Sequence, residues 1–401
     1  MMSGHIVMRA VRRLVHLGVA SALVLAADGC GAGSVGVDYG HYDKTSRATA
    51  GPSMRVRWAK PLAAEFGGAY VPVERGGVAI DPVHDRLFIG SSERELWALE
   101  RTGRELWKRR FDAAIDAEPT LDVRRDELYV ATASGRVHGV SASDGQSRFE
   151  VDLGASISQP GILSEDALYL VTDADGVFAL SRKDGSTLWR YQREPRAGLK
   201  ITGHAGLLSS AQRLLTGFSD GSIVALDKGD GRVLWTVDTT LDLEDSAQAE
   251  IGFVDVDTTP VQAGDTVYAA SFLAGLYALN IHDGSTIVRN AELRGVTSLA
   301  GDERTITLVS AEHGVRCYDL PGLTPRWVRA QGFRGAPNNV RLKDRTLFVT
   351  ESRGALLALA IADGRELGRL QTEHGFAAAP SVTQGQGAIL GNAGTLYAFD
   401  Y

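Results

Sequence analysis

The longest stretch without a basic residue is the first place to look for chemistry. No Lys or Arg lies between Arg232 and Arg289, whereas Asp and Glu recur through this segment. Near its middle, residues 253–261 read Phe-Val-Asp-Val-Asp-Thr-Thr-Pro-Val, so Asp255 and Asp257 alternate with apolar residues. A loop that mixes carboxylates with apolar side chains is typical of an interaction surface. Capping of the turns before a strand would place aspartates at the same positions, and the residues alone leave both interpretations open.

The other polar residues do not form a catalytic pattern. The nine histidines are scattered along the chain, and none pairs with another at the i, i+4 spacing of a zinc-binding helix. Neither a Gly-x-Ser-x-Gly nucleophile turn nor a phosphate-binding loop occurs. The sequence therefore predicts a protein that is not an enzyme, with no catalytic residue, no metal site and no cofactor.

A four-residue phrase recurs eight times and indicates the architecture. Its third residue is small in most copies, and these residues are separated by steps of 41, 40, 46, 53, 39, 41 and 40, at positions 98, 139, 179, 225, 278, 317, 358 and 398. Periods in the forties are typical of propeller blades or of helical arrays. Each phrase lies in a short run rich in Val, Leu, Tyr and Thr that Gly or Asp-Gly bounds, which favours strands.

Within each repeat, two further features are expected to be structural. Asp-Gly pairs mark the third turn, where Gly supplies the positive φ of a tight hairpin; they are Asp144-Gly145, Asp184-Gly185, Asp230-Gly231, Asp283-Gly284 and Asp363-Gly364. An aromatic residue often lies nine or ten positions after the third residue of the phrase, and it is expected to fill the gap between adjacent blades. These residues are Trp107, Phe149, Trp189, Trp235 and Trp327.

The last repeat ends with the chain and lacks its outer strand, which residues 54–58 can supply together with Trp58. The sequence therefore predicts an all-β fold, an eight-bladed β-propeller of four-stranded antiparallel blades whose last blade is closed by the N-terminal strand. We expect residues 1–29 to be a signal peptide, residues 30–53 a flexible tether rich in Gly, Ser and Thr, and residues 54–401 the propeller.

The N-terminus has the arrangement of an export signal. Arg9, Arg12 and Arg13 precede an apolar stretch, residues 14–27, that is too short to span a bilayer permanently. The stretch leads to Gly29-Cys30, which resembles the bacterial lipobox, although Ala27 and Asp28 depart from the usual pattern. This resemblance implies that Cys30 carries a lipid, palmitate included, and anchors the chain to the periplasmic face of the outer membrane. Plain secretion is the alternative.

The net charge argues against one class of partner, and the cysteine content indicates the role of Cys317. The net charge of −7, with a pI near 5.8, argues against nucleic acid as a partner. Cys30 and Cys317 are the only cysteines, and Cys317 takes the small-residue place of its phrase, so we expect it to be a packing thiol.

The repeats also resemble two known families. The pattern from Ala225 through Gly231 to Trp235 is similar to the tryptophan-docking motif of quinoprotein dehydrogenases, but this chain has no pair of adjacent cysteines such as those enzymes place above their quinone. The string from Asp255 to Val261, with the phrases, the lipobox and the closing strand, resembles the BamB family, lipoprotein subunits of the outer-membrane β-barrel assembly machinery.

The second resemblance implies a function and a set of contact residues. It implies a non-enzymatic scaffold that binds the POTRA domains of the barrel-inserting subunit through Asp255 and Asp257. Leu199 and Ile201 match a second contact loop of that family, in which Thr202 replaces an arginine. A single chain within a hetero-oligomeric complex is expected. A quinone (PQQ)-dependent oxidoreductase and a periplasmic propeller with another partner are the alternatives.

The lipid anchor can be tested directly. Replacing Cys30 by Ser removes the thiol that lipidation would modify, so the variant should leave the membrane fraction while the propeller stays folded. Metabolic labelling with palmitate measures the modification, and membrane fractionation measures the anchoring. Equal labelling of the two proteins would contradict the lipoprotein prediction.

Overall fold

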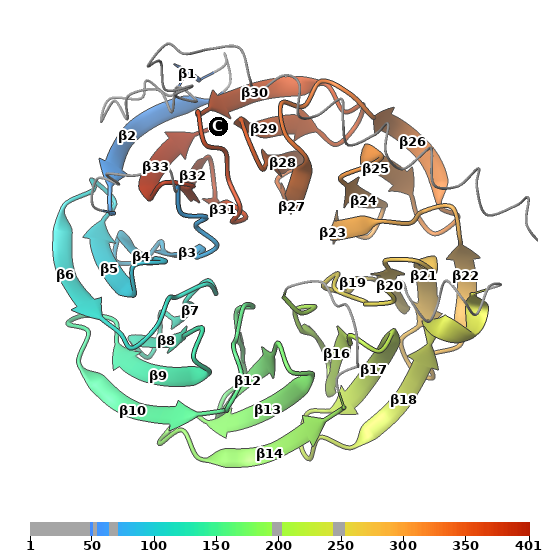
Figure 1. Cartoon of the computed structure of the whole chain (residues 1–401), viewed down its shortest axis with the longest axis horizontal. Helices are drawn as coiled ribbons and strands as arrows, with labels where there is room; N and C mark the ends of the chain where they lie inside the picture. The colour runs from blue at the N-terminus through green and yellow to red at the C-terminus, as the bar shows by residue number, and fades with distance from the viewer. Residues whose placement is uncertain (1–48, 51–53, 64–70, 195–202, 244–252) are drawn as a thin grey trace, which may run out of the picture. The chain divides into compact units, whose positions relative to one another are not determined.

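The computed structural model describes residues 49–50, 54–63, 71–194, 203–243 and 253–401. In this part of the chain, eight antiparallel sheets are arranged around a central axis like the blades of a propeller (Figure 1). Each sheet consists of four consecutive strands, from the axis outward, except at the two ends of the chain. The predicted fold class, an eight-bladed propeller of four-stranded blades, is confirmed.

The strands of the first four blades follow the chain in order. Blade 1 contains β3 (Val78–Asp81), β4 (Arg86–Gly90), β5 (Glu95–Glu100) and β6 (Glu105–Arg110). Blade 2 contains β7 (Thr120–Asp122), β8 (Glu127–Ala131), β9 (Arg136–Ser141) and β10 (Ser147–Asp152). Blade 3 contains β11 (Ile162–Leu163), β12 (Ala167–Thr172), β13 (Gly176–Ser181) and β14 (Thr187–Gln192). Blade 4 contains β15 (Leu208–Ser210), β16 (Arg213–Gly217), β17 (Ser222–Asp227) and β18 (Val233–Asp238), and a short 3-10 helix, η3 (Thr239–Asp242), follows it.

The last four blades repeat the same plan. Blade 5 contains β19 (Val261–Ala263), β20 (Thr266–Ser271), β21 (Gly275–Asn280) and β22 (Thr286–Asn290). Blade 6 contains β23 (Val296–Gly301), β24 (Thr305–Ser310), β25 (Gly314–Asp319) and β26 (Thr324–Arg329). Blade 7 contains β27 (Pro337–Lys343), β28 (Thr346–Glu351), β29 (Ala355–Ala360) and β30 (Glu366–Gln371). Blade 8 contains β31 (Ser381–Thr383), β32 (Gln386–Gly391), β33 (Thr395–Asp400) and, as its outer strand, β2 (Arg55–Pro61).

The recurring small residue makes room for the aromatic residue of its own blade. Ala98 lies opposite Trp107 in the pairing of β5 with β6, and Gly139 lies opposite Phe149 in that of β9 with β10. A side chain at Gly139 would come within 2.5 Å of the Phe149 ring. The same pairing joins Ala179 to Trp189, Ala225 to Trp235, Cys317 to Trp327 and Ala398 to Trp58. Cys317 is buried in this place, as predicted.

The aromatic residue of each of these pairs then packs on the third turn of the next blade. Trp107 covers Gly145, where a side chain would lie 2.8 Å from the indole, and its Nε1 donates to Ala142 O at 3.1 Å. Gly145 has φ +70°, so the Asp-Gly turn needs its glycine both for the backbone and for the ring. Equivalent glycines meet Phe149, Trp189, Trp235 and Trp327 at Gly185, Gly231, Gly284 and Gly364. The predicted filling of the gaps between blades is confirmed.

The two ends of the chain close the ring within blade 8. Strand β2 pairs with β33, and Trp58 donates its indole N–H to Arg101 O of blade 1 at 2.9 Å. Strand β1 (Thr49–Ala50) adds a fifth strand to blade 7 by pairing with β30, which the sequence analysis did not predict.

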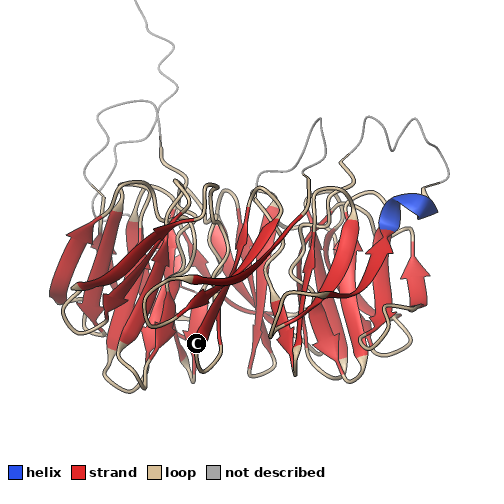
Figure 2. Cartoon of the chain, turned by 90° about the horizontal axis from the view of Figure 1, so that it is seen from below, coloured by secondary structure: helices blue, strands red, loops and turns tan. Residues whose placement is uncertain are grey.

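The outer strands of the blades end on one face of the propeller. Figure 2 shows this face at the top, with η3 on it. Because the strands of a blade alternate in direction, the turn between the second and third strands of each blade lies on this face too. We call it the upper face.

Ring closure makes a testable prediction about stability. Trp58→Ala removes the contact with Gly103 of blade 1 and the bond to Arg101 O, and should lower the free energy of unfolding by about 2–4 kcal/mol. Urea unfolding measures the loss. Leu188→Ala, at a side chain 55% exposed on β14, is the control and should change little. Deleting residues 54–61 should destabilise the ring further, and a truncated protein as stable as the wild type would refute this closure.

Candidate functional site

A cavity of about 670 Å³ lies on the propeller axis. The inner strands and the connections between blades line it, so residues far apart in the sequence face one another across it. Four carboxyl groups, Asp116, Glu118, Asp173 and Asp257, share the lining with Arg75 and Arg341. Burial raises the pKa of Asp116 and of Glu118, although Arg75 and Arg341 respectively act against the shift. The cavity is therefore predominantly acidic.

Asp257 lies in an environment that disfavours its ionised form. Its Oδ2 atom is buried and has no hydrogen-bond partner among the residues that the structure describes. Burial, followed by the charge of Asp255, raises the pKa of Asp257 to about 7, while His204 acts in the opposite direction. Such a carboxyl group costs folding free energy when it ionises, and perturbed groups of this kind occur often at functional sites.

The string that carries Asp257 is held between blades 4 and 5. Val256 N donates to Phe218 O at 3.1 Å, and Phe272 N donates to Asp255 O at 2.9 Å. Thr258 Oγ1 accepts from Ala270 N at 3.0 Å. The Asp255 side chain is 1% exposed and therefore lies inside the protein, whereas Asp257 faces the cavity. Of the two predicted contact aspartates, only Asp257 lines the axial cavity, and partner contact by either stays a prediction.

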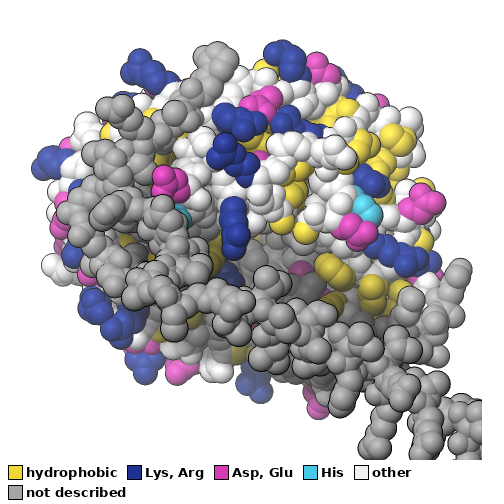
Figure 3. Space-filling model, turned by 45° about the horizontal axis from the view of Figure 1, so that its top comes forward, with side chains coloured by type: hydrophobic (Ala, Val, Ile, Leu, Met, Phe, Trp, Pro, Cys, Tyr) yellow, Lys and Arg dark blue, Asp and Glu magenta, His cyan; other side chains and the backbone are white. Residues whose placement is uncertain are grey.

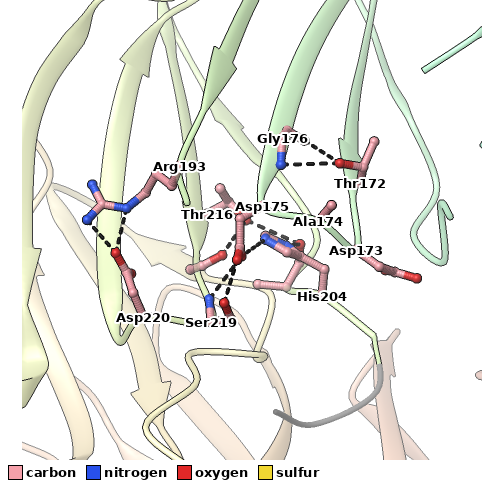
Figure 4. A network of polar contacts seen from close by, with 12 residues as sticks. Thr172, Asp173, Ala174, Asp175, Gly176, Arg193, His204, Thr216, Ser219 and Asp220 are labelled. Carbon is pink, nitrogen blue, oxygen red and sulfur yellow. Dashed lines mark hydrogen bonds and ion pairs between the residues drawn. The ribbon is translucent and has the colours of Figure 1, made fainter. Parts of the chain in front are cut away.

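The remaining predicted residues, Cys30, Leu199 and Ile201, lie outside the described residues, as does Thr202. Arg193 and His204, which lie on either side of residues 195–202 in the sequence, are described, and both take part in a polar network on the upper face (Figure 4). Arg193 donates from Nε to Asp220 at 2.7 Å. His204 pairs through Nε2 with Asp175 at 3.1 Å, and Asp175 also accepts from Ser219 N at 3.0 Å.

Sequence reasoning missed this network because its members are far apart in the chain. His204 was only one of nine scattered histidines, and Asp175 lies 29 residues before it. The structure itself marks the site, since Asp175, in the turn between β12 and β13, has φ +60°. A non-glycine residue in that conformation indicates a position that the surrounding contacts determine.

A second cavity, of about 720 Å³, lies between blades 2 and 3 on the opposite face. Arg182 lines it, but this side chain is 4% exposed and all of its donors have partners within the fold. Its Nη2 pairs with Glu127 at 2.7 Å and with Asp122, and its Nε donates to Tyr129 Oη at 3.0 Å. This ion network joins two blades, so we assign it to stability.

The surface and the remaining polar groups add little to the site. In the view of Figure 3, Lys and Arg side chains are scattered among acidic and apolar ones. Within the described ranges, no group of three or more His, Cys, Asp or Glu is placed to hold a metal ion. No helix in that part of the chain is long and apolar enough to cross a membrane.

Fold and repeats place the chain in the class of PQQ-like eight-bladed propellers. Residues 92–329, more than half of the chain, match the family described as outer membrane protein assembly factor BamB. The chain belongs to this family. The outer membrane protein assembly factor BamB of Shewanella oneidensis is 22% identical over 310 residues, which cover 74% of this chain and 77% of that protein.

Solved structures agree on the fold. The crystal structure of BamB from Moraxella catarrhalis superposes with a TM-score of 0.72 at 19% identity, and the match covers 87% of this chain and all of that one. A quinohemoprotein alcohol dehydrogenase from Comamonas testosteroni superposes with a TM-score of 0.62 at 13% identity, covering 87% of this chain and 76% of that one. At these identities the likeness concerns the fold.

The raised pKa of Asp257 predicts how stability changes with pH. The folded protein keeps this proton up to a pH of about 7, whereas the unfolded chain releases it near 3.8. Stability is therefore lost as the pH rises from about 4 to about 7, and Asp257→Asn should escape this loss. The variant should be more stable than the wild type at pH 8, by roughly 1–4 kcal/mol, and nearly equal to it at pH 4.

Urea unfolding at the two pH values measures this difference. Asp283→Asn is the matched control, because Asp283 lies in an exposed turn and hydrogen bonds from Ser285 lower its pKa. That variant should not gain stability at pH 8. An Asp257→Asn protein no more stable than the wild type at pH 8 would show that Asp257 carries no such cost.

Proposed function

We propose that this chain is a non-enzymatic scaffold in the assembly of outer-membrane β-barrel proteins. A lipid on Cys30 holds it on the periplasmic face of the outer membrane, and its upper face binds the POTRA domains of the barrel-inserting subunit. Membership of the BamB family supports the assembly role. The basic, apolar and Gly29-Cys30 arrangement of the N-terminus supports the anchor.

The observation that carries the docking site is the buried Oδ2 of Asp257 at the axial cavity, which finds no hydrogen-bond partner in the described part of the chain. A basic side chain of a partner would supply the missing hydrogen bonds and the opposite charge. Charge-assisted bonds of this kind contribute about 1.5–3 kcal/mol each. Binding would thereby offset the folding free energy that the isolated propeller loses when Asp257 ionises.

Leu199 and Ile201 are proposed as the apolar part of the same docking site. They follow Arg193 by six and eight residues in the sequence, and they precede His204. Arg193 and His204 both belong to the upper-face network. Apolar side chains at the centre of an interface usually supply most of its affinity, whereas charges orient the partner and speed its approach. Thr202, which stands where the family has an arginine, reduces the number of bonds this segment can donate.

Binding of the purified chain to the POTRA domains of its cognate subunit tests the proposal. Changing Leu199 and Ile201 together to Ala should weaken binding at least about tenfold at any salt concentration. Leu188→Ala is the matched control, since Leu188 is an exposed leucine on the outer strand β14. Wild-type affinity in a folded double variant would remove this segment from the docking site.

Asp257→Asn tests the electrostatic part separately. The variant should bind about tenfold more weakly at low salt, and the difference should shrink as ionic strength rises if the partner's group is exposed before binding. Asp283→Asn is again the control. Asp255 is unsuitable for charge reversal, because its side chain is 1% exposed and a lysine there would disturb the fold.

A further inference from the structure

The strand that closes the ring starts on the face opposite the upper one, which we call the lower face. Like the other outer strands, β2 ends on the upper face. Its first residue, Arg55, pairs with Asp400 at the end of β33, and its last residue, Pro61, pairs with Thr395, which follows the upper-face turn between β32 and β33. A tether that led straight into β2 would therefore reach the propeller from its lower face.

Strand β1 places the preceding part of the chain on the upper face instead. It pairs antiparallel with β30 of blade 7, with Thr49 opposite Gln371 and Ala50 opposite Leu370. Gln371 is the last residue of the outer strand β30, so Thr49 lies at the upper end of blade 7. Between Thr49 and Arg55 the chain thus passes from the upper face to the lower one.

The outer strand of blade 7 is more buried than outer strands elsewhere in the ring. None of the six residues of β30 is exposed, and Leu370, which lies opposite Ala50, is fully buried. In each of β6, β10 and β14, by contrast, four of the six residues are exposed. An open edge offers unpaired backbone groups to any extended chain. At blade 7 that edge is covered, and β1 is the strand that pairs with it.

Met54 fastens the chain between β1 and β2. Blade 7 lacks the aromatic residue that most blades have, because Gly368 lies opposite Ala358. Met54 is 3% exposed and belongs to the apolar cluster between blades 7 and 8, together with Phe348 and Phe399. The unbranched side chain of methionine fills irregular gaps well. The chain before β2 is thus held at this junction by packing as well as by the pairing of β1.

We propose that β1 is a strap that makes the N-terminal tether start at the upper face of the propeller, beside blade 7, instead of at the lower face, where β2 begins. A lipid on Cys30 then holds the upper face toward the membrane, and only this consequence rests on the proposed function. Residues 31–48 lie between Cys30 and Thr49 and can span at most about 65 Å. A small domain is about 30 Å across, so a partner fits between the membrane and this face.

A disulfide tests the strap in the purified protein, without a membrane. Thr49→Cys with Gln371→Cys, in a chain that also carries Cys30→Ser, puts thiols on opposed residues of β1 and β30. Opposed residues of antiparallel strands lie about 4.5–5.5 Å apart at Cα, which suits a disulfide. Mild oxidation should therefore join them, and peptide mass spectrometry measures the product. Cys317 is buried and should stay reduced.

Two other pairs are the controls. Thr49→Cys with Glu366→Cys tests the lower end of the same strand, and Thr49→Cys with Gln192→Cys tests the equivalent upper end of β14 in blade 3. Neither pair should form a disulfide. A folded protein that does not join positions 49 and 371, or that joins 49 to 366 as readily, would overturn the strap.

Labelling of the membrane-bound protein separates the strap from the proposed function. A bulky thiol reagent should modify Glu312→Cys, in an exposed turn of the upper face, more slowly than Asp283→Cys, in an exposed turn of the lower face. Thr49→Pro with Ala50→Pro removes two backbone N–H groups from β1 and should abolish this difference. Ser46→Pro, outside β1, should preserve it. If the disulfide forms but both cysteines are labelled equally on the membrane, the strap is confirmed and its role in orienting the anchored protein is contradicted.

Discussion

The contact between an aromatic residue and the third turn of the following blade holds this propeller together. The ring is a flat apolar surface, and a glycine in the turn leaves space for it. A tryptophan also donates a hydrogen bond to the backbone of the next blade. Trp189, for example, packs on Gly231 and donates from Nε1 to Lys228 O at 2.9 Å. Each contact joins two neighbouring blades only. The ring is therefore closed only when blade 8 also contacts blade 1, and Trp58 on β2 makes that contact. Two blades lack the aromatic residue, since Val288 and Gly368 lie opposite the small residue there.

Closure of the ring creates the axial cavity and determines which residues face it. The inner strands cannot approach one another across the axis, so their side chains and the connections between blades surround an open space. Polar groups from several blades meet there without having to pair within one sheet. Asp257 is the clearest case, since its carboxyl group is buried without a full set of partners, at a cost that the fold itself does not require.

The sequence predicts the blades well because their determinants are local and repeat. An Asp-Gly pair specifies its third turn, and a small residue opposite an aromatic one specifies the same packing in the blades that have the pair. The polar network on the upper face could not be predicted in this way. Asp175 and Ser219 belong to blades 3 and 4 and His204 to the connection between them, and the packing of the two blades brings them together. The burial of Asp255 likewise depends on how the string lies between two turns, which its alternating pattern does not reveal.

The residues at the upper mouth of the axial cavity also differ in what they can offer a partner. By the family resemblance, Thr202 stands in this chain where an arginine is expected, so this position has no guanidinium donor. Two residues later in the sequence, His204 is buried and pairs with Asp175 at 3.1 Å. A buried side chain cannot reach a partner, whereas Asp257 lines the cavity. The upper mouth should then meet a basic surface mainly as an acceptor, and the affinity of such an interface depends more on ionic strength than that of one with bonds donated from both sides.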